Sequence, residues 1–200
     1  MNALPLTPSV IEAAYRHGFF PMAMEDGAIR WFSPDPRGIL PLGAFHASRR
    51  LRRVIRSGRF AVTVDRAFGD VVAGCAENRA DGTWISDEIV RAYAQLHERG
   101  SAHSVEVWQA GSLAGGLYGI GLGGAFFGES MFHRVTDASK VALHALVARL
   151  VERGYVLLDT QWLTPFLENL GGIEIPRPVY LALLERALRL DCRFSDEDAD

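Results

Sequence analysis

The stretch AFFGESMFH, residues 125–133, decides the fold that we expect, because it reads as the last of three consecutive strands near the middle of the chain. The two strands before it are predicted at residues 103–108 and 113–122, and residues 109–112, QAGS, have the composition of a hairpin turn. The middle of the chain is therefore predicted to form a β-sheet. One acidic side chain, Glu129, lies in this sheet among aromatic and sulfur-containing neighbours.

The segments after this stretch read as helix, strand and helix. An amphipathic pattern that begins at Asp137, the expected N-cap, predicts a helix, and residues 155–160 predict a strand. A short helix is expected near 163–170 and a last helix from about Pro176. The expected fold class is α+β, a mixed sheet with flanking helices. It is similar to the sheet of acetyltransferases that use acetyl coenzyme A (the GNAT type).

The first half of the chain is predicted to combine helices with short strands. Thr7-Pro8-Ser9 begins a helix that ends near Gly18, capped by Thr7 or Ser9. The other expected elements are strands at 29–32, 37–40 and 60–64 and helices at 47–57, 66–78 and 86–98, the last capped by Ser86. We divide the chain into a small N-terminal lobe (1–43), an acetyltransferase-like domain (44–190) and an acidic C-terminal tail (191–200), whose end we expect to be frayed and solvated.

The composition is that of a globular protein, with 48% hydrophobic and 22% charged residues. No apolar run approaches the roughly 20 residues that span a bilayer, and the first residues lack the pattern of a secretory signal. Cys75 and Cys192 have no metal-ligand spacing, and the histidines show no ligand pattern. We therefore expect a cytoplasmic protein with no metal site, no membrane partner and, for want of an uncovered apolar stripe, a monomeric state.

Positive charge is concentrated in one segment. The net charge of the whole chain is −3. Residues 46–59 contain no acid and six arginines, so the remainder carries −9, which is −3 minus +6. These arginines are Arg49, Arg50, Arg52, Arg53, Arg56 and Arg59. The apolar positions of this segment have helical spacing, so the first five should lie mostly on the outer face of a helix.

An acid and an amide lie at the end of the strand predicted at 155–160, the acid inside it and the amide directly after it. Asp159 and Gln161 are two residues apart, and in a strand such side chains point to the same face. The two groups can therefore reach one reacting centre. A carboxylate and an amide beside an apolar pocket suit a proton-assisted acyl transfer to an amine.

Six segments of the chain, taken in order, match a known family. They are GFFP (18–21), WFSPDPR (31–37), DGTWI (81–85), HSVEVW (103–108), GESMF (128–132) and DTQ (159–161). With them the chain resembles the bacterial leucyl/phenylalanyl-tRNA–protein transferases over residues 7–186. The resemblance implies that Leu or Phe, and less readily Met, moves from its tRNA to the N-terminal amine of a protein that begins with Arg or Lys. The product is then marked for N-end rule degradation. No cofactor is implied, because the tRNA ester is already activated.

The same resemblance suggests roles for the acidic residues and the amide. Asp159 would orient Gln161 or the incoming α-ammonium and help remove its proton, although the tRNA itself is an alternative base. Otherwise Asp159 would only end a strand and cap the next helix. Glu129 would bind the amine or the basic first residue of the acceptor protein, and its other expected partner is Arg134. A buried carboxylate needs such a partner.

Hydrophobic and aromatic residues complete the expected site. Leu117, Phe126, Met131 and Leu143 would line the pocket for the Leu or Phe side chain, or serve as ordinary core. Trp31, Trp84 and Tyr93, whose hydroxyl is expected to be free, would hold the terminal adenosine of the tRNA. Trp31 could equally dock the N-terminal lobe. Arg49, Arg50, Arg52, Arg53 and Arg56 would contact tRNA phosphates, or form only a solvated face.

Two other classes of function compete with this interpretation. An N-acyltransferase that uses an acyl coenzyme A would keep the sheet, but the glycines of residues 115–121 lack the basic residue of a pyrophosphate-binding loop. An inactive tRNA- or peptide-binding module is the third possibility, and the presence of Asp159, Gln161 and Glu129 disfavours it. The chain also lacks the N-terminal extension that many family members have before Thr7, so the strength of its tRNA binding stays open.

Overall fold

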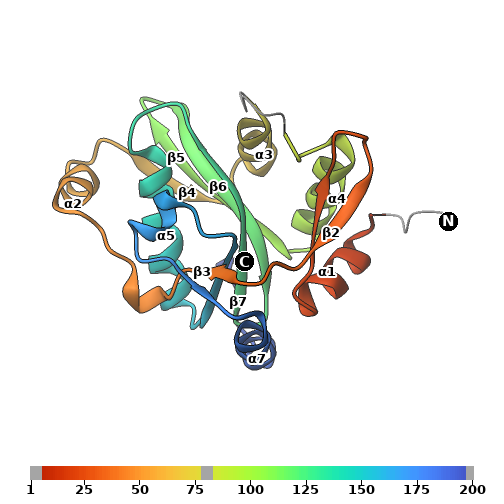
Figure 1. The fold of residues 1–200 in the computed structure, drawn as a ribbon. Helices are drawn as coiled ribbons and strands as arrows, with labels where there is room; N and C mark the ends of the chain where they lie inside the picture. Colours follow the sequence, from red (N-terminus) through yellow and green to blue (C-terminus); the bar gives the residue numbers. More distant parts are fainter. Residues whose placement is uncertain (1–5, 78–82, 197–200) are drawn as a thin grey trace.

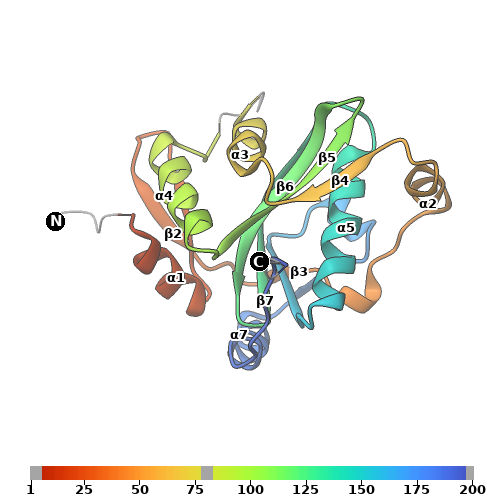
Figure 2. The ribbon, with the colours of Figure 1, turned by 180° about the vertical axis from the view of Figure 1, so that it is seen from behind.

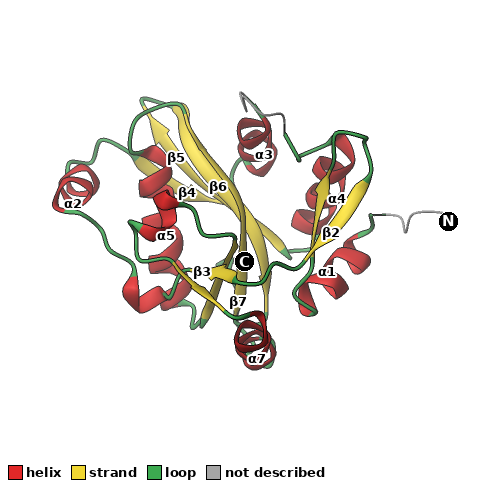
Figure 3. Cartoon of the chain, in the orientation of Figure 1, coloured by secondary structure: helices red, strands yellow, loops and turns green. Residues whose placement is uncertain are grey.

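The computed structural model describes residues 6–77 and 83–196, and the expected elements occur in the expected order (Figure 3). The helices are α1 (Pro8–Arg16), α2 (Arg49–Arg56), α3 (Phe68–Ala76), α4 (Asp87–Glu98), α5 (Ala138–Glu152), α6 (Pro165–Glu168) and α7 (Arg177–Ala187). The strands are β1 (Phe20–Ala23), β2 (Ile29–Phe32), β3 (Arg37–Ile39), β4 (Ala61–Val64), β5 (Ala102–Gln109), β6 (Ser112–Leu122), β7 (Ala125–His133), β8 (Leu157–Gln161) and β9 (Ile173–Ile175). The α+β prediction is confirmed.

Seven of the strands form one mixed sheet in the order β4-β5-β6-β7-β8-β3-β9. All neighbours are antiparallel except β7 and β8, which run parallel. The helix α5 connects these two strands, as a crossover between parallel strands requires. The strands β1 and β2 form a separate two-stranded sheet. The strand β3, from the segment that we assigned to the N-terminal lobe, lies inside the main sheet, and the division into domains stays a prediction.

Helices cover both faces of the main sheet. In Figures 1 and 2, α5 lies on one face with α2 beyond it, and α1, α3 and α4 lie on the other. Each face has its own hydrophobic cluster: Leu117 and Leu143 belong to the cluster under α5, and Tyr15, Tyr93 and Phe127 to the cluster under α1 and α4. The alternation of Phe126 and Phe127 between the two clusters follows from the pleat of a strand.

Two irregularities interrupt the sheet at corresponding points of β7 and β8. Tyr118 pairs with Ser130 but Gly119 pairs with Gly128, so Glu129 is an extra residue on β7. On β8, Gln161 pairs with Gly38 and Asp159 with Ile39, which leaves Thr160 as the extra residue. A bulge of this kind turns the following side chains to the opposite face. Position 119 requires glycine, because an added Cβ would lie 2.2 Å from the carbonyl oxygen of Phe127.

The local signals at the helix ends were mostly correct. The side chains of Thr7 and Ser86 accept hydrogen bonds from the backbone N–H groups of Val10 and Ile89, as N-caps do. Asp137 is an exception, because it holds the N-cap position of α5 without making a cap hydrogen bond. Its backbone is left-handed, with φ 73°, and its carboxylate instead pairs with Arg50 (3.0 Å) and Lys140 (3.6 Å).

The end of the chain is more closely attached than we expected. Phe194 is only 2% exposed and stacks on Phe126, with ring centroids 5.0 Å apart. The hydroxyl of Ser195 donates a hydrogen bond to Asp65, and Asp196 pairs with Arg149 and Arg153. Ser195 and Asp196 are exposed, as expected, although an aromatic anchor precedes them and both make polar contacts.

Some predictions lie outside the described residues: Met1–Pro5 at the start, Asn78 at the end of the third predicted helix, Asp81-Gly82 of the family match, and residues 197–200 of the acidic tail. Within the part of the chain that the structure covers, no helix combines the length and the apolarity needed to cross a membrane.

Candidate active site

A cavity of about 330 Å³ opens where β7 and β8 separate. The two strands pair from Ala125 to Phe127 and from Leu157 to Asp159, and no pairing extends beyond these residues. Residues 128–131 of β7 line one side of the opening, and Thr160 and Gln161 of β8 line the other. Both bulges therefore lie at the cavity, and the cavity reaches both faces of the sheet.

The end of the cavity under α5 is apolar. Leu143 and Leu146 from α5 face Leu117 from β6 and Leu158 from β8, and all four are at most 2% exposed. Met131, Phe166 and Leu167 complete this end. A pocket of this shape and chemistry accepts a branched or aromatic hydrocarbon side chain. Met131 adds adaptability, since its thioether is flexible.

The other end of the cavity holds Glu129. Its Oε1 accepts a hydrogen bond from the hydroxyl of Tyr15 (2.7 Å) and one from Nε2 of Gln161 (3.4 Å), and its Oε2 accepts one from the hydroxyl of Tyr93 (3.1 Å). The two tyrosine hydroxyls are themselves 2.7 Å apart. The expected partner Arg134 is elsewhere, paired with Glu77. Glu129 is thus satisfied by neutral donors instead of a cation.

The surroundings of Glu129 favour its protonated form. Burial raises the pKa of Glu129 from 4.5 to about 7. The hydrogen bonds from Tyr15 and Tyr93 act in the opposite direction, and the charges of Asp159 and Arg37 raise and lower the pKa respectively. Burial and the nearby carboxylate also raise the pKa of both phenols, so each stays a hydrogen-bond donor. A carboxyl group that titrates near neutral pH lies directly at the cavity.

Asp159 lies behind this wall and not in it. Its carboxylate forms a fully buried, two-pronged ion pair with Arg37, with Nε–Oδ1 and Nη2–Oδ2 distances of 2.9 and 2.6 Å. It also accepts hydrogen bonds from the Tyr180 hydroxyl (2.7 Å) and from the backbone N–H of Gln161 (2.9 Å). These contacts hold Gln161 in its left-handed conformation, φ 59°, with its amide against Glu129.

Arg37 connects the site to the rest of the molecule. Its Nη1 donates a hydrogen bond to the carbonyl oxygen of Gly18 (3.0 Å), and its guanidinium packs over the rings of Phe20 and Tyr180. Burial alone would lower the pKa of Arg37, but its hydrogen bonds and charge interaction with Asp159 raise it overall. The charge pair is therefore fixed inside the protein.

The structure brings together most of the site residues that the sequence suggested. Gln161, Glu129, Leu117, Met131, Leu143 and Trp84 all line the cavity. Apart from Asp159 and the arginines of α2, three others do not. Phe126 is fully buried against Phe194 and Tyr155, because the pleat points it under the sheet below the opening. Trp31 packs against the cluster under α1 and α4 and does not line the cavity.

Tyr93 is the third exception, and it differs from the expectation in an instructive way. We expected a free hydroxyl that could reach the terminal adenosine of a tRNA. The side chain is instead fully buried, and its hydroxyl is bonded to Tyr15 and Glu129. Tyr93 lies on the apolar face of α4 with Ile89, Ala92 and Leu96, so helical spacing was a signal for its burial that the sequence analysis did not use. Stacking of Tyr93 on a base is excluded by this burial.

Several residues of the site escaped the sequence analysis. Tyr15, Arg37 and Tyr180 hold the two carboxylates, and Phe20, Met22 and Trp162 surround the opening. Trp162 is 43% exposed and makes edge contacts with Phe20 and Phe32. Phe20 and Arg37 lie within the matched segments GFFP and WFSPDPR. The family match was therefore the signal that could have identified these two as site residues.

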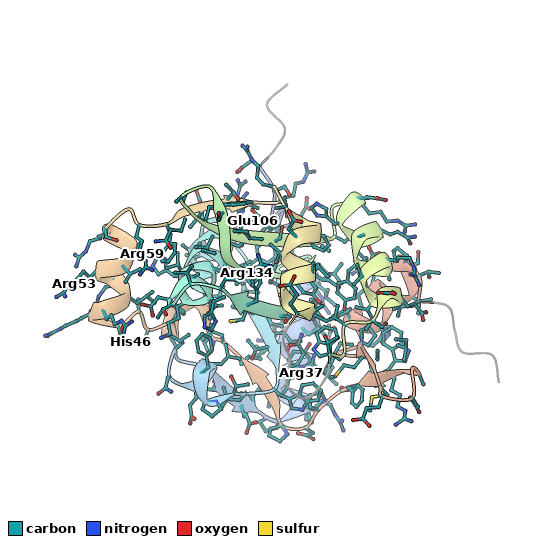
Figure 4. The ribbon with its side chains drawn as sticks, turned by 90° about the horizontal axis from the view of Figure 1, so that it is seen from above. Arg37, His46, Arg53, Arg59, Glu106 and Arg134 are labelled. Atoms are coloured by element: carbon teal, nitrogen blue, oxygen red, sulfur yellow. The ribbon has the colours of Figure 1, made fainter. Side chains whose placement is uncertain are left out.

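The arginine-rich segment forms the helix α2, as expected. Arg49, Arg50, Arg52, Arg53 and Arg56 are all exposed, whereas Leu51 is buried against α5. Figure 4 shows Arg53 projecting from the margin of the molecule, far from the buried Arg37. Within the described residues, Arg50 is the one member of the five that has a salt bridge. The remaining four present free positive charge on one surface.

The glycine segment does not form a phosphate-binding loop. Residues 115–121 lie wholly inside β6 and pair with β5 on one side and β7 on the other. Their backbone N–H groups are largely used in the sheet and cannot cradle a pyrophosphate. In residues 6–77 and 83–196 no group of three or more His, Cys, Asp or Glu side chains is placed to hold a metal ion.

A mixed sheet that opens between two parallel strands, with an apolar pocket on one face and a titratable carboxyl group on the other, is compatible with the acyltransferase class that the sequence suggested. Comparison with known sequences supplies the family. Residues 39–185 match the family described as leucyl/phenylalanyl-tRNA protein transferase, and residues 5–35 match the N-terminal domain of the same family. The chain belongs to the leucyl/phenylalanyl-tRNA–protein transferases, a family of aminoacyltransferases.

Individual relatives agree with this membership. The leucyl/phenylalanyl-tRNA–protein transferase of Salinibacter ruber is 55% identical over 184 residues, which cover 92% of this chain and 80% of that protein. The protein of the same name from Rubrobacter xylanophilus is 52% identical over 191 residues and is covered to 99%.

Solved structures with a similar fold are much more distant in sequence. A GCN5-related N-acetyltransferase from Kribbella flavida is 10% identical, with a TM-score of 0.43. The match covers 84% of this chain and 60% of the Kribbella chain. L-PGS from Bacillus licheniformis is 13% identical, with a TM-score of 0.47. The match covers 90% of this chain and 70% of the L-PGS chain.

Proposed function

We propose that this protein transfers Leu or Phe, and less readily Met, from aminoacyl-tRNA to the N-terminal α-amine of proteins that begin with Arg or Lys. The observation that carries the proposal is the cavity between β7 and β8, which has an apolar end under α5 and the carboxyl group of Glu129 at the other end. The apolar end takes the Leu or Phe side chain. The ester of the tRNA then lies at the level of the bulges, near Gln161.

The chemistry requires that a protonated amine lose a proton before it attacks. A carboxyl group with a pKa near neutral pH is matched to this transfer. In our proposal Glu129 binds the α-ammonium of the acceptor, and Asp159 acts through Gln161, whose backbone it holds. The new C–N bond forms at the ester carbonyl, the C–O bond to the ribose breaks, and the second amine proton passes to the ribose oxygen.

The tRNA would be held at two places. Trp84, a partly buried aromatic side chain at the cavity, is suited to stacking on the terminal adenosine. The exposed arginines of α2 supply contacts to phosphates, which fix the position of an RNA without reading its sequence. No further cofactor is needed for this reaction, since the aminoacyl ester is already activated.

The consequence for the acceptor protein follows from its new first residue. A protein that begins with Leu or Phe carries a signal for N-end rule degradation, so the reaction marks its acceptors for proteolysis. Charged tRNA is present in the cytoplasm, which is the compartment that we propose. A single copy of the chain contains every group that the proposed mechanism uses, consistent with action as a monomer.

The proposal is tested by transfer of radiolabelled Leu or Phe from charged tRNA to a protein with N-terminal Arg. The matched acceptor begins with Ala and is otherwise identical, and a second control is treated with RNase. Label on the Arg acceptor alone, and only with intact charged tRNA, is the expected result. Acylation supported by an acyl coenzyme A without RNA would overturn the proposal in favour of the other acyl donor.

A further inference from the structure

Two tyrosines from distant parts of the chain converge on Glu129. Tyr15 comes from α1 and Tyr93 from α4, and both side chains are fully buried. The three oxygen-to-oxygen distances in this group are 2.7 Å for Tyr15–Tyr93, 2.7 Å for Tyr15–Glu129 and 3.1 Å for Tyr93–Glu129. The three polar groups thus form a closed triangle, with its carboxyl corner at the cavity.

The number of protons in this triangle depends on the state of Glu129. Each hydrogen bond needs one O–H donor, and each phenol supplies one. With Glu129 ionised, two donors serve three contacts, so one contact lacks a proton. With Glu129 protonated, three donors serve three contacts, and every side of the triangle is a complete hydrogen bond. The arrangement therefore accommodates an added proton without movement of heavy atoms.

We propose that Tyr15 and Tyr93 are positioning residues for Glu129, which hold its carboxylate at the cavity and redistribute their hydrogen bonds when it accepts the proton of the acceptor's α-ammonium. This inference rests on the proposed function. The proton leaves the nitrogen, the N–H electron pair stays on the amine, and Glu129 becomes neutral. Glu129 later returns the proton to solvent. No oxidant, reductant or further reactant takes part.

Other groups around Glu129 also affect its pKa. Arg37 from β3 and Asp159 from β8 act through their charges, and Gln161 donates a hydrogen bond. Tyr118 from β6 lies behind Tyr93, with ring centroids 5.8 Å apart. The phenols differ from these groups because they alone contact both the carboxylate and each other, so their hydroxyls can be removed one at a time.

The first test is the pH dependence of kcat/KM for an acceptor peptide with N-terminal Arg, measured for wild type, Tyr15→Phe and Tyr93→Phe. Removing a donor to a carboxylate disfavours its ionised form. The acidic limb of the profile is therefore expected to move to higher pH by about 1 unit in each variant. The matched control is Tyr155→Phe, which removes a buried hydroxyl on the other face of the sheet and should leave the limb in place.

The second test does not depend on activity. The protein is labelled with ¹³C at the carboxyl carbon of glutamate, and the Glu129 resonance is identified by its loss in Glu129→Gln. Its titration midpoint should rise in Tyr15→Phe and in Tyr93→Phe and stay fixed in Tyr155→Phe. Thermal unfolding confirms that each variant is folded.

The outcomes separate the inference from the proposed function. A midpoint that does not move in folded Tyr15→Phe and Tyr93→Phe, or that moves equally in Tyr155→Phe, overturns the inference. Loss of activity by the same factor at every pH would also overturn it, since that indicates a structural role only. A midpoint that moves while wild type transfers no amino acid from tRNA would support the positioning of Glu129 and refute the proposed function.

Discussion

Glu129 is a half-buried carboxyl group that has no salt bridge within the described part of the chain. Burying an unpaired charge is costly, and proteins commonly avoid the cost by binding a proton. At Glu129 burial raises the pKa of the carboxyl group and the hydrogen bonds from Tyr15 and Tyr93 lower it, which leaves the pKa near neutral pH. The residue is therefore adapted to exchanging a proton and poorly adapted to stabilising the fold.

The raised pKa of Glu129 should make the free energy of unfolding depend on pH. Because the pKa of Glu129 is 4.5 in its unperturbed state and about 7 in the folded protein, the folded state binds the proton more tightly. The free energy of unfolding therefore falls as pH rises from about 4.5 to 7, by up to about 3 kcal/mol for this group. Glu129→Gln should remove that fall, as measured by urea denaturation at several pH values.

The comparison needs a carboxylate that lies elsewhere. Glu174 on the exposed strand β9 provides it, and Glu174→Gln should retain the wild-type pH dependence. If wild type and Glu129→Gln lost stability in parallel across this range, Glu129 would not be the group that titrates.

Asp159 has the opposite character, since it is fully buried and paired with the guanidinium of Arg37. Asp159→Asn leaves the guanidinium of Arg37 buried without its counter-charge, which typically costs about 3–5 kcal/mol. We expect a large loss of stability in chemical denaturation and a loss of transfer activity with it. Asp26→Asn removes the exposed pair with Arg30 and should cost less than about 1 kcal/mol. Equal effects of the two substitutions would contradict the assignment.

The sequence indicated the important residues better than their arrangement. Asp159 and Gln161 were expected to act side by side because they are two apart in a strand. The bulge at Thr160 breaks that alternation, so Asp159 lies behind the wall of the cavity and Gln161 lies in it. A bulge depends on how two strands pair, and pairing is not visible in the order of residues of one strand.

At the scale of elements, the strands that bound the cavity owe their separation to two extra residues. Glu129 and Thr160 each interrupt the pairing of their strand with its antiparallel neighbour. Beyond them β7 and β8 no longer pair with each other. Glu129 consequently faces α1 and α4, whereas Met131, two residues on, faces α5. One bulge thus supplies both the polar and the apolar end of the cavity.

The helix α2 carries a prediction about salt. Arg52, Arg53 and Arg56 are exposed and form no salt bridge to any described residue, so each is available to a phosphate. Changing all three to Ala should weaken tRNA binding and reduce the slope of log K against log salt concentration by about 2 to 3. Filter binding at several salt concentrations measures both quantities.

Three arginines outside α2 serve as the control for charge. Arg91, Arg99 and Arg186 are also exposed, and their joint change to Ala alters the net charge by the same amount. The expected salt slope is that of wild type. A slope that changes as much in this variant would show that the interaction follows total charge and not the surface of α2.

The sequence predicted the long elements closely and the short strands β2, β3 and β4 near their positions, but it missed β1 and β9. The strands β5, β6 and β7 and the helices α4 and α5 were placed within one or two residues, because each has enough residues to show a pattern. The strand β9 has three residues and was not predicted. The segment of β3 was read as extended, but its place between β8 and β9 depends on contacts with residues more than a hundred positions away.

At the scale of the whole molecule, both ends of the described chain are fastened to the two faces of the sheet. The helix α1 contributes Tyr15 to one cluster, and Phe194 enters the other beside Phe126 and Tyr155. The carbonyl oxygen of Phe194 also accepts a hydrogen bond from Arg149 (2.7 Å). Phe194 is thus part of the core that supports the sheet.

Removing this anchor should destabilise the whole fold. Phe194→Ala deletes a buried aromatic ring, which typically costs about 3–5 kcal/mol, and we expect one cooperative transition at lower denaturant concentration. Leu190→Ala, at a side chain that is 40% exposed, should change stability by less than about 1 kcal/mol. A Phe194→Ala protein as stable as wild type would show that the end of the chain is not held in solution.

The contacts of Arg37 have a consequence for the protein during its synthesis. Its guanidinium needs the carbonyl of Gly18, the carboxylate of Asp159 and the ring of Tyr180. A nascent chain lacks the last of these until residue 180 has been added, when nine-tenths of the 200 residues have been made. A chain that stops before residue 180 therefore cannot complete the surroundings of the Arg37–Asp159 pair.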